Sequence, residues 1–203
     1  MDWLTGLGLS VDVTNEFGKA PLRDAVDWGQ IAAVRLLLDK GADVRLRDGN
    51  DYTAVHDADS MEMLELLLNA GAPVDDMSGG GGWPLHSACE SGDVDGVQFL
   101  LKKGADPNLT TTGGTSLFAA TCSGALEVVK VLLEAGADPN IQDCDGWTCL
   151  WSADSLPMAE LLLRHGANPS LGDYHGSLPE DWRGLPWAVA ALLKDWRKGQ
   201  NTM

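Results

Sequence analysis

The chain has 203 residues, with 14 Lys and Arg against 30 Asp and Glu, so its formal net charge is −16 at pH 7. This excess of carboxylates argues against a nucleic-acid-binding or lipid-docking protein, because both functions depend on clustered Lys and Arg. Apolar residues make up 44% of the chain, which argues against general disorder. The apolar runs are too short to cross a bilayer, and no basic segment precedes the first of them. We therefore expect a cytoplasmic protein with reduced cysteines.

Along the chain, near copies of Gly-Ala-Asp recur five times and define a repeat. They begin at Gly41, Gly71, Gly104, Gly136 and Gly166, which lie 30–33 residues apart. A leucine-rich block such as VRLLLDK precedes each glycine, and its leucines fall on one face of a helix. The pattern predicts five helices that each end at the glycine.

A second, shorter helix is predicted upstream of each block. Its segments are KAPLRDA (19–25), YTAVHDA (52–58), WPLHSA (83–88), TSLFAA (115–120) and WTCLWSA (147–153). These segments resemble the T-P-L-H-x-A signature of the ankyrin repeat, and the two motifs recur in register along almost the whole chain. The resemblance implies an all-α fold, an ankyrin repeat solenoid of stacked helix-turn-helix units with protruding hairpin loops. One such unit cannot bury its own apolar face, so neighbouring units must stack.

The resemblance also predicts how the chain is organised. We expect a single ankyrin repeat domain over residues 1–203. It comprises an N-terminal cap (1–14), repeats at 15–46, 47–75, 76–108, 109–140 and 141–170, a C-terminal cap (171–198) and a tail (199–203).

In the second and fifth repeats the signature Ala and the stop glycine are 13 residues apart, against 16 in the other three, so three residues are missing between them. The deletion falls where the first helix ends, so we expect a truncated inner helix in both. Asp59 or Ser60, and Asp154 or Ser155, are then the predicted N-caps of the following helices, because Asp and Ser are good capping residues. A functional notch on the concave side is the alternative interpretation, and both can hold.

No pattern in the sequence points to catalysis, a cofactor or a metal. His56 and His86 occupy the signature position, where the resemblance implies a bridge between neighbouring loops. The four cysteines have no zinc-binding spacing, and the glycine run 79–82 lacks the Lys and Ser or Thr of a phosphate-binding loop. We predict no catalytic, cofactor-binding or metal-binding residues.

Aromatic residues are the more informative signal, since the chain has 8 Trp. In ankyrin proteins the loop tips and inner helices form the concave partner-binding surface, and Trp and Tyr there resemble interface hot spots. The alternative is that they pack between neighbouring loops, as we expect for Trp182 and Trp187 in the C-terminal cap. The predicted partner-binding residues are Phe17, Trp28, Asp51, Tyr52, Trp83, Glu90, Asp145, Trp147 and Tyr174.

Acidic residues gather in the same zone, whereas the basic residues fall mostly on the outer helices. The acidic set is Glu16, Asp24, Asp27, Asp48, Asp51, Asp57, Asp59, Glu90, Asp93, Asp145 and Asp154. Such a sign split favours a basic partner.

The leading hypothesis is a non-catalytic, monomeric protein–protein interaction module whose protein partner carries a basic surface, with no binding to nucleic acid or membrane. The alternative is an inhibitor or immunity protein that neutralises a basic enzyme or toxin. An enzyme or a small-ligand protein is the third hypothesis and the one with least support.

Overall fold

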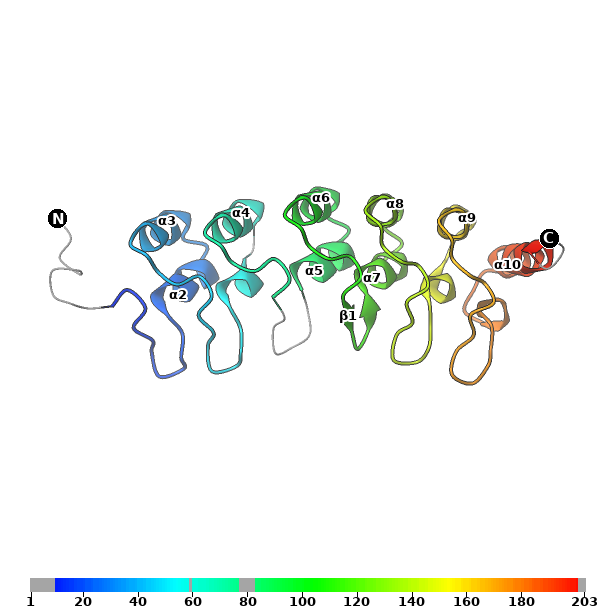
Figure 1. Cartoon of the computed structure of the whole chain (residues 1–203), viewed down its shortest axis with the longest axis horizontal. Coiled ribbons are helices and arrows are strands. Elements are labelled where there is room, and N and C mark those ends of the chain that lie inside the picture. The colour runs from blue at the N-terminus through cyan, green and yellow to red at the C-terminus, as the bar shows by residue number, and fades with distance from the viewer. Residues whose placement is uncertain (1–9, 59, 77–82, 201–203) are drawn as a thin grey trace. The chain divides into compact units, whose positions relative to one another are not determined.

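The structure is a computed structural model, and it describes residues 10–58, 60–76 and 83–200. The regular secondary structure of the described chain is almost entirely helical, as predicted, with loops between the helices (Figure 1). The chain divides into two compact units, unit 1 (Met1–Pro84) and unit 2 (Leu85–Met203). The predicted single domain stays a prediction.

Each repeat has an outer helix that ends at its predicted glycine. The outer helices are α3 (Ile31–Asp39), α4 (Met61–Asn69), α6 (Val94–Lys102), α8 (Leu126–Glu134) and α9 (Leu156–Arg164). The five glycines that follow have positive φ angles of 82–93°. After α3, Gly41 N donates to Leu38 O and Ala42 N to Leu37 O, both at 3.0 Å. This hydrogen-bonded stop requires a left-handed residue, and glycine adopts that conformation without strain.

The inner helices differ in length as the spacing predicts. Three of them are regular α-helices: α2 (Pro21–Asp27), α5 (Pro84–Ser91) and α7 (Ser116–Cys122). In the short repeats a single 3₁₀ turn takes their place, η1 (Ala54–Asp57) or η2 (Cys149–Ser152). The truncated inner helix of repeats 2 and 5 is confirmed.

The predicted caps of the short repeats have different outcomes. Ser60 Oγ accepts the backbone N–H of Met63 at 3.3 Å and caps α4. Ser155 stands at the N-cap of α9 without a side-chain bond, so that part of the prediction is wrong. Pro157 occupies the second helical position there and removes one of the N–H groups that a cap would bind. Asp59 lies outside the described residues.

In each unit, apolar side chains fill the space between the inner and outer helices. In unit 1, α2 contacts α3 and η1, and α3 contacts α4. In unit 2, α8 contacts α6, α7 and α9. The largest fully buried side chains come mainly from the leucine blocks and the signature segments: Leu22, Met63, Leu67, Leu85, Leu100, Leu117, Leu132, Leu150, Met158, Leu162, Leu193 and Val26.

The C-terminal cap of unit 2 consists of η3 (Pro179–Asp181) and α10 (Trp187–Gln200), which contact each other. The helix runs past the predicted start of the tail at residue 199. Two short strands in the fourth repeat, β1 (Thr110–Thr111) and β2 (Gly114–Thr115), form an antiparallel pair in which Thr110 lies opposite Thr115.

Asparagines join neighbouring repeats in unit 2. Asn108 Oδ1 accepts the N–H of Asp138 at 2.8 Å, and its Nδ2 donates to Gly136 O at 3.3 Å. Asn140 makes the same two bonds one repeat later, with Asn168 N at 2.7 Å and Gly166 O at 3.0 Å. These bonds satisfy exposed backbone groups and fix the spacing of the hairpins within this unit.

Candidate protein-binding surfaces

Four of the described loop tips, two in each unit, are built by one recurring turn. An Asp or Asn side chain accepts the backbone N–H groups two and four residues ahead. In this way Asn15, Asp48, Asp143 and Asp173 each fold their own tip. These turns are the local reason why the tips hold a defined backbone.

In three of these turns a glycine with positive φ follows three residues after the Asp or Asn: Gly18, Gly146 and Gly176. Asp51 takes that place in the second tip, with φ 68°, and its carboxylate lies 3.1 Å from Arg47 Nη1. A left-handed Asp costs free energy that glycine avoids. Asp51, a predicted partner-binding residue, is exposed.

The first tip and α2 of unit 1 frame an open cleft of about 630 Å³. Phe17 and Trp28 line it with their side chains 69% and 77% exposed. Three carboxylates share its lining with Lys19 and two asparagines: Asp24, Asp27 and Asp48. The structure thus brings two of the predicted aromatic residues together with acidic residues of the predicted set.

Two of the carboxylates that line the cleft are already paired with basic side chains of the same chain. Lys19 forms an ion pair with Asp27. Arg23, which is buried in α2, pairs with Asp48, and its Nε donates to Asp57 at 2.5 Å. Arg23 stands at the signature position of repeat 1, where His56 stands in repeat 2. Arg23 is not among the residues that line the cleft, but it holds Asp48, which is, and the sequence pattern did not single it out.

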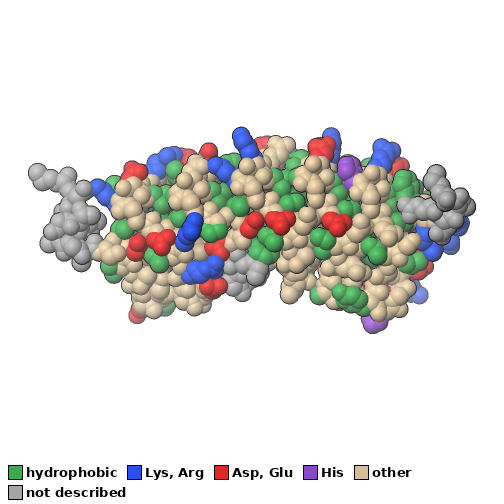
Figure 2. Space-filling model, viewed as in Figure 1, with side chains coloured by type: hydrophobic (Ala, Val, Ile, Leu, Met, Phe, Trp, Pro, Cys, Tyr) green, Lys and Arg blue, Asp and Glu red, His purple; other side chains and the backbone are tan. Residues whose placement is uncertain are grey.

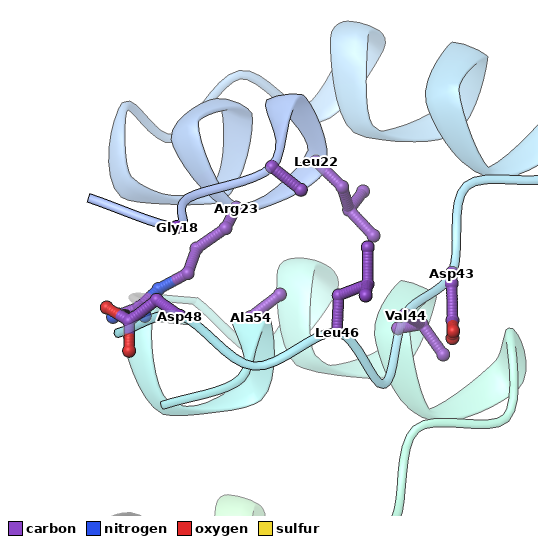
Figure 3. Close-up of a pocket in the computed structure, with 9 residues that line it drawn as sticks. Gly18, Leu22, Arg23, Asp43, Val44, Leu46, Asp48 and Ala54 are labelled. Carbon is purple, nitrogen blue, oxygen red and sulfur yellow. Dashed lines mark ion pairs between the residues drawn. The ribbon is translucent and has the colours of Figure 1, made fainter. Parts of the chain in front are cut away.

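The charge of Asp48 follows from these contacts. Burial opposes its ionisation, but the backbone N–H groups of Tyr52 and Asn50 and the Arg23 guanidinium outweigh that cost and hold the pKa of Asp48 below its ordinary value. Figure 3 shows Arg23 and Asp48 side by side at a small cavity of about 10 Å³, which Leu22, Leu46 and Ala54 also line. This cavity is too small for a ligand and belongs to the packing of unit 1.

Two other predicted aromatics of unit 1 are less accessible. Tyr52 is half-buried, with its ring centroid 5.7 Å from that of His56 and 5.4 Å from Arg23 Cζ. Trp83 is only 6% exposed. The expectation of an exposed anchor at Trp83 is therefore not met, because its indole packs inside the protein.

In unit 2 the predicted aromatic Trp147 belongs to a tryptophan cluster. Its ring stacks on Trp151 with centroids 5.3 Å apart and planes 2° from parallel, and Trp182 lies 4.9 Å from Trp147. Trp151 is buried and occupies the signature position of repeat 5. Trp147 thus joins its repeat to the cap, as the packing alternative described.

The remaining predicted residues of unit 2 lie on its surface. Tyr174 is 69% exposed and donates through its hydroxyl to Asp143 O at 3.4 Å. Asp145 is exposed at the neighbouring tip, and the exposed Glu90 carboxylate lies 3.7 Å from His86 Nε2. Trp187, expected to pack in the cap, is instead 84% exposed.

The predicted sign split between the two faces is incomplete. Figure 2 shows Asp and Glu side chains among the Lys and Arg side chains over the outer helices. On the loop side, Arg23 and Arg47 are paired with Asp48, Asp57 and Asp76. Sequence reasoning missed these pairs because their partners come from the next repeat.

Histidine and cysteine have structural surroundings. The predicted bridge of His56 is confirmed, since its Nε2 lies 2.9 Å from Asp76 O in the next loop. All four cysteines are free, and burial raises the pKa of the Cys89 and Cys149 thiols to about 12, which keeps them protonated. Within residues 10–58, 60–76 and 83–200, no group of three or more His, Cys, Asp or Glu is placed to hold a metal ion. The same described residues contain no helix long and apolar enough to cross a membrane.

Comparison with known proteins agrees with this geometry. The family model for ankyrin repeats in three copies matches residues 47–111 and 85–173, and the single ankyrin repeat model matches residues 17–49. Human ankyrin repeat and SOCS box protein 3 is 42% identical over 163 residues, which are 74% of this chain and 31% of that protein. The palmitoyltransferase Hip14 of Drosophila melanogaster is 39% identical over 82% of this chain and 27% of its own length. The chain therefore spans about a third or less of these relatives.

Shorter relatives match more completely. The putative ankyrin repeat protein YahD of Escherichia coli is 30% identical over 85% of this chain and 76% of its own. The crystal structure of the ankyrin repeat domain of Bcl-3 superimposes with a TM-score of 0.82 at 29% identity, covering 96% of this chain and 90% of that domain. The repeated helix pairs, their glycine stops and these matches together show that the chain belongs to the ankyrin repeat family.

Proposed function

We propose that this ankyrin repeat module binds a protein partner with a basic surface and catalyses no reaction itself. The observation that carries the proposal is the cleft of unit 1, where Phe17 and Trp28 expose most of their side chains beside carboxylates. Exposed aromatic residues contribute nothing to the core, but they provide large contact area in an interface at low entropic cost.

Acidic residues around the aromatics support a basic partner. Asp51 in unit 1 and Asp145 and Glu90 in unit 2 are exposed, and the chain as a whole carries −16. Such charges accelerate the encounter with a basic protein and repel an acidic one. Tyr174 extends the proposal to unit 2. Trp83 does not belong to the proposed surface because it is buried, and Trp147 does not because its ring packs against Trp151 and Trp182. The free thiols support a reducing compartment such as the cytoplasm.

The proposal can be tested by affinity purification from extracts of the source cells. The immobilised full chain is compared with the double variant Phe17→Ser/Trp28→Ser and with Trp187→Ser, whose side chain is equally exposed but lies in the cap of unit 2. We expect basic proteins to be retained by the wild type and by Trp187→Ser, lost by the double variant, and released by added salt.

Retention of neutral or acidic proteins without salt dependence would contradict the proposed partner class. Retention of the same basic protein by the double variant would show that the binding surface lies outside the cleft of unit 1. A tight one-to-one complex that blocks a basic enzyme would identify the inhibitor alternative.

A further inference from the structure

We propose that the cleft of unit 1 is a recognition site for an arginine side chain of the partner, and that Lys19 competes with this arginine for the cleft. The inference rests on the proposed function and makes it specific, because it names the chemical group that is bound and a residue of this chain that opposes binding.

The aromatic wall of the cleft is held in place by backbone bonds. Phe17 N donates to Asn15 Oδ1 at 2.9 Å, and Phe17 O accepts the N–H of Gly49 at 3.2 Å. Trp28 N donates to Asp24 O at 3.1 Å, and Trp28 O accepts from Gln30 Nε2 at 3.1 Å. Both side chains are nevertheless exposed, so they are accessible to a ligand while their backbone is held in place.

The carboxylates of the cleft differ in whether they already have an ion-pair partner. Asp48 is held by Arg23 and by two backbone N–H groups, which keep it turned toward the protein. Asp27 pairs with Lys19. Asp24, which is half-buried on α2, forms no ion pair with any described residue. Asp24 is thus available as an acceptor, and Asp27 becomes available when Lys19 moves away.

This combination fits arginine better than lysine. A guanidinium is planar, stacks on aromatic faces and offers several N–H donors to carboxylates at once. An ammonium group is strongly hydrated and stacks less well. The cleft volume of about 630 Å³ exceeds one side chain, so the residues that flank the arginine also find room.

Lys19 is the internal competitor because its ammonium group already lies on Asp27 within the cleft. A guanidinium of the partner can pair with Asp27 only if it displaces the Lys19 ammonium group. Removal of the Lys19 charge, which would weaken a purely structural ion pair, should therefore strengthen binding.

The experiment uses the full chain and three blocked tripeptides that differ in one side chain. They are acetyl-Gly-Arg-Gly-amide, its lysine analogue and its citrulline analogue, which keeps the shape of arginine without its charge. Binding is followed by the NMR shift of the Trp28 indole N–H, assigned by its loss in Trp28→Phe, up to tens of millimolar peptide. We expect a saturable shift with arginine, a several-fold weaker one with lysine, and one at least ten-fold weaker with citrulline.

Variants then separate recognition from folding. Asp24→Asn should weaken arginine binding at least five-fold, Lys19→Met should strengthen it two-fold or more, and Trp187→Ala should leave it unchanged. Far-UV circular dichroism and the urea midpoint check that each variant is folded. A gain with Lys19→Met cannot arise from damage to the fold.

The proposal is wrong if the arginine peptide does not shift the Trp28 indole, if citrulline binds as well as arginine, or if Lys19→Met weakens binding. None of those results would contradict the proposed binding of a basic protein, provided that the chain still captures such a protein. Conversely, arginine binding without capture of any basic protein would contradict the function and not the site.

Discussion

The first and fifth repeats contact their neighbours through different kinds of side chain at the same place in the repeat. At the signature position, Arg23 in unit 1 joins its repeat to the next loop through Asp48, whereas Trp151 in unit 2 stacks on Trp147 and lies beside Trp182. One junction is ionic and hydrogen-bonded, and the other is aromatic. The difference shows that a fixed place in the repeat dictates a contact to the neighbour but not the kind of contact.

The consequence for function is which aromatic residues remain accessible. In unit 2 the junction takes up Trp147 and Trp151, so these rings are packing residues. In unit 1 the junction is made by charged groups, and Phe17 and Trp28 stay exposed beside the cleft. The same residue type therefore has a structural role in one unit and a proposed binding role in the other.

The largest expected effect is the loss of the tryptophan cluster. Trp151→Ala removes a buried ring and leaves a cavity against Trp147, so the free energy of unfolding should fall by about 4 kcal/mol. Urea denaturation measures it, with Trp28→Ala as the matched control, since that exposed ring should contribute less than about 0.5 kcal/mol. Equal losses in the two variants would contradict the contrast between packed and free tryptophans.

The ionic junction should be nearly as costly to break. Arg23→Leu leaves Asp48 and Asp57 without their cation in a buried setting, and we expect a loss of about 3 kcal/mol in unfolding free energy. Arg35→Leu is the control: its pair with Glu62, at 3.0 Å, is exposed on both sides and should contribute less than about 1 kcal/mol. If both variants unfold at the same urea concentration, Arg23 does not hold the junction.

Acid should weaken unit 1 through Asp48. Because the folded protein lowers the pKa of this carboxyl, its stabilising contribution is complete above the ordinary value of about 3.9 and disappears as the pH falls through the lowered value. Asp48→Asn keeps an oxygen for the loop N–H groups but cannot titrate. Its unfolding free energy should depend less on pH below about 4 than that of the wild type. Parallel pH profiles would show that Asp48 does not contribute to acid unfolding.

The smallest effect concerns the second loop tip, where Asp51 takes the place that a glycine has in the other three described turns of this kind. Asp51→Gly relieves a left-handed residue at φ 68° and should stabilise the protein by about 1 kcal/mol, reduced by the loss of the exposed pair with Arg47. Thermal unfolding measures the gain. A destabilised variant would mean that the Arg47 pair outweighs the backbone strain.

Much of this architecture is readable from local patterns. The recurring glycines predict the helix ends, and the missing three residues predict the truncated inner helices and a cap at Asp59 or Ser60, because these features depend on residues close in sequence. The contacts that join one repeat to the next do not depend on residues close in sequence alone. The burial of Trp83 and the stacking of Trp147 involve side chains outside their own segments, such as Trp182 beside Trp147, and a repeat pattern does not identify those neighbours.

The cleft illustrates the same limit. The sequence placed Phe17 and Trp28 on the expected surface and Asp24 among the acidic residues, but no spacing rule joins these three to Lys19. Their proximity depends on how the first loop folds against α2 and how Gly49 meets Phe17 O.

The most direct test of the account measures two quantities on two variants, Trp28→Ser and Trp151→Ser: the urea midpoint and the affinity for the arginine tripeptide, followed through backbone amide shifts of the first loop. We expect Trp28→Ser to keep the wild-type midpoint and to lose at least five-fold in affinity. We expect Trp151→Ser to have a much lower midpoint and, under conditions where it is folded, to bind the peptide like the wild type. Wild-type affinity in Trp28→Ser, or a midpoint lowered as far as in Trp151→Ser, would contradict the division between a packed and a binding tryptophan.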